Sequence, residues 1–182
     1  MSPTVFVDAF ADGPRQRPPM DEAAFLELYA RTAAPLTGYL RRLTGNLAVA
    51  DDLLQDTYVR LLHLTSLPSG DDHRRHYVFR IATNLARDYF RRGSRHVSID
   101  VVAESAAAAE SGGFSSDVWS QLARVSTRDR ELLLLAYVEG MTHAEIAVVT
   151  GLVKASVRPL LFRARRRFAA RLRAVGLGEA WR

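Results

Sequence analysis

The stretch RRHYVFRIATNLARDYFRRGSR, from Arg74 to Arg95, decides the fold. Wound as a helix of about 3.6 residues per turn, it places an apolar face opposite a polar one. The apolar face holds Val78, Ile81, Ala82, Leu85 and Tyr89, and the polar face holds Arg80, Asn84, Arg87 and Arg91. The pair Arg87 and Arg91, four residues apart, repels by ~0.2–0.5 kcal/mol, which Asp88 alone offsets locally. We therefore expect an anion from outside to complete the polar face.

The residue types on this helix favour nucleic acid as that anion. Arginine and asparagine accompany Tyr77, Phe79, Tyr89 and Phe90, a combination that suits phosphate contacts together with stacking of unpaired bases. A helix lying on a membrane surface would need no asparagine in the basic stripe. Read alone, the stretch also fits a solvated arginine face on a bundle helix.

Charge is strongly segregated along the chain. The formal net charge is +5, but Arg74 to Arg95 carries +6 and Ile146 to Gly178 carries +8 without an acidic residue, which leaves the remainder acidic. Two basic blocks on an acidic background favour two contacts with a polyanion.

Length and composition narrow the class of protein. The 182 residues allow one large or two small domains, and the absence of cysteine excludes disulfides and thiolate chemistry. No apolar run approaches the roughly 20 residues of a membrane span, and the first residues do not resemble an export signal. The proline-bearing segment 1–19 is predicted to be a flexible tail.

The pattern after Asp21 predicts a three-helix bundle over residues 20–93. A first helix, which Pro35 should kink or split, ends at Gly45 and Asn46. A second helix spans Val49 to Leu64, a loop covers Leu67 to Asp72, and the third helix is Arg74 to Arg92.

A second small bundle is predicted over residues 117–182, after a flexible linker at 94–116. Ser126 is an expected helix N-cap and Gly140 an expected stop. Thr142 and Glu145 form a T-x-x-E capping box for a short helix, and Gly151 turns the chain into a final basic helix, which makes a helix-turn-helix. The fold class is therefore all-α: two small helical bundles joined by a flexible linker, the second containing a helix-turn-helix.

Three segments in this order resemble the extracytoplasmic-function (ECF) sigma factors of bacterial RNA polymerase. They are ADDLLQDTYVRL at 50–61, YVFRIATNLARDYFRR at 77–92 and EGMTHAEIAVVTGL at 139–152. The resemblance implies a cytoplasmic, non-catalytic specificity subunit without a cofactor. It also implies three partners: core RNA polymerase through its β′ and β subunits, promoter DNA, and an anti-sigma factor.

The resemblance also implies roles for individual residues. The segment that contacts the clamp coiled coil of β′ corresponds to Asp51, Asp52, Gln55 and Asp56. The segment that binds the minus-10 element corresponds to Tyr77, Arg80, Asn84, Arg87, Asp88 and Arg91, with Tyr77 able either to stack on a base or to pack in the core. Candidates for the minus-35 element are Lys154, Ser156, Arg158 and Arg163, while Arg165, Arg166, Arg167 and Arg171 are expected to meet phosphate or solvent.

Pro159 departs from the family pattern, which rarely has proline in the recognition helix. In a helix starting at Lys154, Pro159 would lose a hydrogen bond and clash with the Ala155 carbonyl, at a cost of about 3 kcal/mol. We therefore expect the helix to start near Ser156, with Lys154 and Ala155 outside it.

Two other functions remain open from the sequence. One is a helix-turn-helix regulator that acts without core polymerase, which leaves 50–92 unexplained; the other is a sigma-like interaction protein that does not start transcription, which Pro159 favours. Catalysis or a metal is not expected, because His63, His73, His76, His96 and His143 lack ligand spacing beyond the weak pair His73 and His76.

Overall fold

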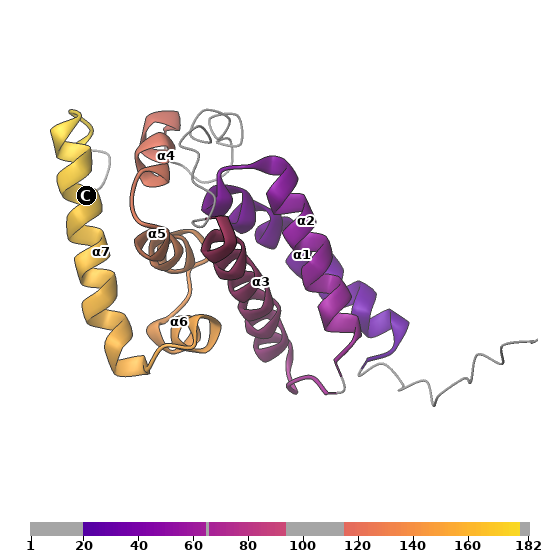
Figure 1. Ribbon diagram of the computed structural model, residues 1–182. Coiled ribbons are helices and arrows are strands. Elements are labelled where there is room, and N and C mark those ends of the chain that lie inside the picture. Colours follow the sequence, from indigo (N-terminus) through magenta and orange to yellow (C-terminus); the bar gives the residue numbers. More distant parts are fainter. Residues whose placement is uncertain (1–19, 65, 94–114, 179–182) are drawn as a thin grey trace, which may run out of the picture.

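The computed structural model describes residues 20–64, 66–93 and 115–178, which form helices joined by short loops (Figure 1). The first bundle consists of α1 (Glu22–Thr44), α2 (Leu47–Leu62) and α3 (Asp71–Gly93). The second consists of α4 (Ser116–Ala123), α5 (Thr127–Leu133), the π-helical segment η2 (Leu134–Val138), α6 (His143–Thr150) and α7 (Lys154–Ala174). The all-α fold is as predicted; the linker predicted at 94–116 lies, except for its last two residues, outside the described part of the chain.

Local signals set the ends of α1. Asp21 caps its start by accepting a hydrogen bond from the Ala24 amide at 2.8 Å, and Gly45 ends it in the left-handed region at φ 70°. The helix runs through Pro35 without a break, so the predicted split does not occur. Leu28 before Pro35 and Leu36 after it are both buried, and they hold the two halves of the helix against the same core.

Buried aromatic rings join the three helices of the first bundle. The rings of Tyr39 on α1 and Phe79 on α3 lie 5.5 Å apart, and the Tyr39 hydroxyl hydrogen-bonds Thr83 at 3.0 Å. Tyr58 of α2 is tied to Thr32 of α1 at 2.8 Å. This core fixes the rotation of α3 and hence which of its residues face outward.

The caps predicted for the second bundle are confirmed. Ser126 accepts from the Asp129 amide, Thr142 and Glu145 form the complete capping box, and Gly151 is left-handed at φ 71°. The apolar run after Leu132 continues into η2, where the Glu139 amide bonds the Leu134 carbonyl five residues back. These elements place α6 and α7 as the two helices of the helix-turn-helix.

The prediction for the start of the recognition helix is wrong. The helix α7 begins at Lys154, after Val153, so that Pro159 is its sixth residue and lies inside the helix. Val157 and Leu161 are buried on the two sides of Pro159, and their packing holds α7 in this register against the cost of the missing hydrogen bond. Ser156 is thus in the first turn and is not the N-cap.

The two bundles pack against each other along α3 and α6, and α1 contacts η2, α4 and α5 (Figure 1). The sequence left open whether the chain is compact or extended; the structure is compact. Across this junction, Arg130 of α5 donates to the Leu43 carbonyl of α1 at 2.7 Å, and the Arg42 guanidinium lies 4.7 Å from the centre of the Trp119 ring.

Within the described ranges, none of the helices is both long and apolar enough to cross a membrane. In the same residues, no cluster of three or more histidine, aspartate or glutamate side chains is placed to hold a metal ion.

Candidate nucleic-acid interface

The polar face of α3 forms an exposed stripe, which we call the α3 stripe: Arg80, Asn84, Arg87, Asp88 and Arg91. Arg80, Asn84 and Arg91 are exposed, and Asp88 pairs with Arg91 at 3.0 Å, as its spacing predicts. The buried face of the helix, with Val78, Ala82 and Leu85, fixes this orientation. Cationic and amide groups thus lie along one accessible line, an arrangement suited to a phosphate backbone.

Arg87 is the exception in the α3 stripe, because its guanidinium is held by the second bundle. Its Nε and Nη2 donate to the two carboxylate oxygens of Glu131 at 2.9 and 2.6 Å, and its Nη1 donates to the Thr150 carbonyl at 2.8 Å. Burial lowers the pKa of Arg87, but the hydrogen bonds and charge of Glu131 outweigh it, so the net pKa is raised. Burial raises the pKa of Glu131 despite this partner.

Tyr77 is half-buried and packs against the core of the first bundle. The sequence allowed two roles for this ring, stacking on a base and packing in the core. The ring contributes to core packing, and it is not fully buried.

The minus-35 candidates lie on the outer face of α7. Lys154, Arg158 and Arg163 are exposed, and Ser156 is half-buried in the first turn. The sequence reading missed Phe162, whose side chain is 60% exposed between Arg158 and Arg163. The signal in the sequence was its spacing of four residues from Arg158, which places both on one face of the helix. Contact with a thymine methyl is one use of an apolar side chain on such a face.

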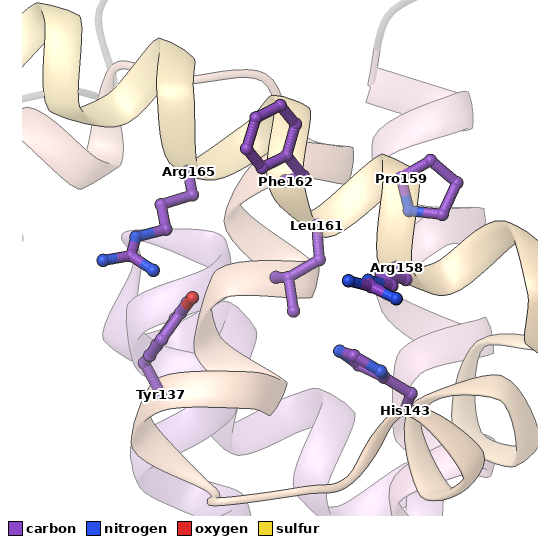
Figure 2. A pocket seen from close by; sticks show the side chains of 7 residues that line it. All are labelled: Tyr137, His143, Arg158, Pro159, Leu161, Phe162 and Arg165. Carbon is purple, nitrogen blue, oxygen red and sulfur yellow. The ribbon is translucent and has the colours of Figure 1, made fainter.

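A groove of about 440 Å³ opens beside this face of α7. Figure 2 shows Arg158 and Arg165 on either side of Leu161, with Arg158 directed at His143 and Arg165 beside Tyr137. Because His143 is the first residue of α6, the groove joins both helices of the helix-turn-helix. The groove therefore combines cations with aromatic side chains.

Two of the arginines expected at phosphate or solvent also form contacts within the protein, although the Arg167 side chain remains 62% exposed. Arg167 donates from Nη1 to both carboxylate oxygens of Asp129, at 3.1 and 2.9 Å, and Arg171 donates to the Gln121 side chain at 3.0 Å. These contacts attach α7 to α5 and α4. The C-terminal half of α7 therefore also helps to hold the second bundle together.

The acidic face of α2 contains the residues that resemble the polymerase-binding segment. Asp52, Gln55 and Asp56 are exposed on it, whereas Asp51 forms a salt bridge with Arg41 of α1 at 3.1 Å. Val59, 51% exposed, extends the face one turn further. The surface therefore offers acidic and amide groups next to an apolar side chain.

Two basic helix faces, one on a helix-turn-helix, and a separate acidic face define a DNA-binding protein with a further protein partner. Comparison with known proteins agrees with this class. Residues 28–96 match the model for sigma-70 region 2, and residues 115–168 match that for sigma-70 region 4.

Several characterised sigma factors are similar over most of the chain. The RNA polymerase sigma factor CarQ of Myxococcus xanthus is 30% identical over 142 residues, which is 74% of this chain and 81% of CarQ. The sigma factor CnrH of Cupriavidus metallidurans is 30% identical over 172 residues, covering 85% of this chain and 89% of CnrH. The chain belongs to the sigma-70 family and is an ECF sigma factor.

Solved structures agree in fold. CnrH in complex with the cytosolic domain of CnrY superposes with a TM-score of 0.61 at 30% identity, over 85% of this chain and 90% of the other. RpoE in complex with the anti-sigma factor NepR from Bartonella quintana gives a TM-score of 0.67 at 21% identity, over 82% and 97%.

The protein is therefore a non-catalytic specificity subunit of RNA polymerase. It binds core polymerase and promoter DNA, and its regions 2 and 4 serve promoter recognition and melting.

Proposed function

We propose that the α3 stripe captures the non-template strand of the minus-10 element, with Arg80, Asn84 and Arg91 as the main contacts. The observation that carries this proposal is their common exposure on one line of the helix. Arginine serves the phosphates, and asparagine can bond a base edge. Tyr77 and Asp88 flank these contacts, and Arg87 joins them once it leaves Glu131.

The outer face of α7 reads the minus-35 element as duplex. Lys154, Ser156 and Arg158 lie near the start of the recognition helix, where side chains reach base edges in the major groove. Arg163 extends this contact along the groove, and Phe162 adds an apolar surface.

The face of α2 with Asp52, Gln55 and Asp56 binds the clamp coiled coil of β′. Asp51 supports this face through Arg41 and contributes less directly. The acidic character of the face makes the association dependent on salt.

An anti-sigma factor is a further partner, and the cytoplasm is the compartment. Two similar solved structures support this: RpoE is bound to the anti-sigma factor NepR, and CnrH is bound to the cytosolic domain of CnrY. In domain terms, residues 20–93 are region 2 and residues 117–182 are region 4, joined by a linker at 94–116.

Run-off transcription with purified core polymerase on templates from the source genome tests the proposal. The variant carries Arg80→Ala, Asn84→Ala and Arg91→Ala. The control carries Arg124→Ala, an exposed arginine at the end of α4, away from the α3 stripe and from α7.

We expect transcripts from the native chain and from the control, and loss of initiation in the triple variant with core binding retained. Equal transcription by the triple variant would refute strand capture by the α3 stripe. Failure of the native chain to bind core would refute the role given to α2.

A further inference from the structure

The contact between Arg87 and Glu131 links the α3 stripe to the junction between the bundles. Three of the five N–H donors of Arg87 are taken by Glu131 and by the Thr150 carbonyl. The side chain of Glu131 is only 3% exposed, so its carboxylate depends on Arg87 for compensation. In the compact form, Glu131 therefore occupies the edge of Arg87 formed by Nε and Nη2, which a DNA phosphate would otherwise take.

The second partner of Arg87 reinforces the contact. Thr150 is the last residue of α6, and its carbonyl is one of the acceptors left unpaired at a helix C-terminus. A guanidinium at this end also meets the negative pole of the helix dipole. Arg87 therefore completes α6 as well as pairing with α5.

Two further pairs follow the same junction. Arg75 of α3 meets Glu139 at 3.2 Å, and His76 meets Glu145 at 3.5 Å. Neither Arg75 nor His76 belongs to the α3 stripe. Among the residues that the structure describes, the Arg87–Glu131 pair is thus the one ion pair that joins a predicted DNA contact to the closure of the two bundles.

We propose that Glu131 is an autoinhibitory lock: its carboxylate occupies Arg87 in place of a DNA phosphate, so that closure of the bundles withholds Arg87 from promoter-strand capture. A carboxylate and a phosphate present the same pair of oxygens to a guanidinium fork, which makes the exchange chemically direct. The lock is a property of the isolated chain and requires no inhibitor. The competition with DNA for Arg87 rests on the function proposed for the α3 stripe.

The first perturbation removes the negative charge of Glu131 or its partner Arg87. Glu131→Gln keeps the shape of the side chain and removes its charge, and Arg87→Ala removes the other partner. Asp129→Asn is the matched control, because Asp129 is also a buried carboxylate on α5 but pairs with Arg167 inside the second bundle.

Closure is measured without DNA. The chain has no cysteine, so spin labels can be placed at Arg60→Cys on α2 and Arg173→Cys on α7, both exposed positions, for distance measurement by double electron–electron resonance. We expect Glu131→Gln and Arg87→Ala each to raise the population with long distances by about tenfold, and Asp129→Asn to leave it unchanged. Circular dichroism checks that the helices are intact; if Glu131→Gln fails to fold, Arg87→Ala alone still tests closure.

Strand capture is measured with a fluorescent single-stranded oligonucleotide, the non-template strand of a promoter on which the chain initiates. We expect Glu131→Gln to bind it about tenfold more tightly than the native chain and Arg87→Ala to show no gain, although both open the molecule.

Unchanged distances in both variants would overturn the lock. If both variants open and Glu131→Gln binds the oligonucleotide no better, competition for Arg87 is refuted. If none of the proteins, the native chain included, binds the oligonucleotide while the distances change, the function proposed for the α3 stripe fails, and with it the competition.

Discussion

Replacement of Arg130 by methionine should destabilise the protein more than any substitution at an exposed arginine. The Arg130 side chain is 9% exposed, and burial lowers its pKa. Its guanidinium donates to four backbone carbonyls: those of Leu122 at 3.2 Å, Leu43 at 2.7 Å and Val125 at 3.4 Å, and that of Ala123. These carbonyls end α4 and α1, so that Arg130 caps two helices at once.

The magnitude follows from two opposed effects. Hydrogen bonds from a charged donor contribute about 1.5–3 kcal/mol each, and a buried carbonyl left without a partner costs about 1–3 kcal/mol. Against this, Arg130→Met removes the cost of burying a charge, which amounts to several kcal/mol. We expect a net loss of about 2–4 kcal/mol in the free energy of unfolding, or a fall in Tm of roughly 5–15 °C.

Urea denaturation followed by circular dichroism measures this loss. Arg124→Met is the control, because Arg124 follows directly on the end of α4 that Arg130 contacts but is itself exposed; we expect it to change stability by less than about 0.5 kcal/mol. A loss for Arg130→Met no larger than that of the control would refute the reasoning. A gain in stability would show that burial of the charge outweighs its four hydrogen bonds.

Three further predictions follow from single side chains. Pro159→Ala should raise the free energy of unfolding by about 1–3 kcal/mol in a urea titration, because it restores an amide donor to the carbonyl four residues earlier in α7; no gain would mean that the helix is already relaxed around proline. Phe162→Ala should leave stability within about 0.5 kcal/mol but weaken binding of a fluorescent minus-35 duplex by roughly tenfold, since the ring is exposed; unchanged affinity would remove it from the interface. Burial lowers the pKa of His76 from its ordinary value of 6.5, so the folded protein resists protonation that the unfolded chain accepts, and stability should decrease as pH falls below 6.5 toward the lowered pKa. In urea titrations between about pH 7.5 and about pH 5.5, His76→Gln should remove this loss of stability. Burial raises the pKa of Glu131 and Glu139, so these two groups stabilise the fold as pH falls, and they do so equally in the native chain and in the variant. The same dependence of stability on pH in both proteins would contradict the prediction.

Helix ends were predictable where one side chain or one glycine sets them. Asp21, Ser126 and Thr142 each accept a hydrogen bond from a backbone amide three residues on, and Gly151 needs only its own φ. These signals depend on neighbours in the chain, so the sequence carries them directly. The outward faces of α3 and α7 were predictable for a related reason, since helical periodicity converts spacing into direction.

The start of α7 was not predictable by the same means. The local rule against proline in a helix favoured a start near Ser156, but buried Val157 and Leu161 keep the helix in register from Lys154. Packing energy from the rest of the bundle outweighed the local cost. The π-helical segment from Leu134 was missed because the apolar run there fits an α-helix equally well.

The partner of Arg87 was beyond any local rule. Glu131 lies 44 residues away in the other bundle, and no helical spacing relates the two positions. Only the packing of α3 against the second bundle brings them together. The same is true of Arg167, which periodicity places on a DNA-facing helix but which pairs with Asp129.

The polar character of the junction bears on how the two bundles can separate. Arg75, Arg87 and Arg130 cross it, each with oxygen acceptors on the other side. When such a junction opens, water or phosphate oxygens can replace those acceptors, whereas separation of a purely apolar interface would expose surface with no replacement partner. The net cost of opening is therefore small compared with the number of contacts broken, as in transient interfaces between domains. Arginine contacts at the junction therefore fit the lock proposed for Glu131, because the phosphates of DNA can supply the replacement anion.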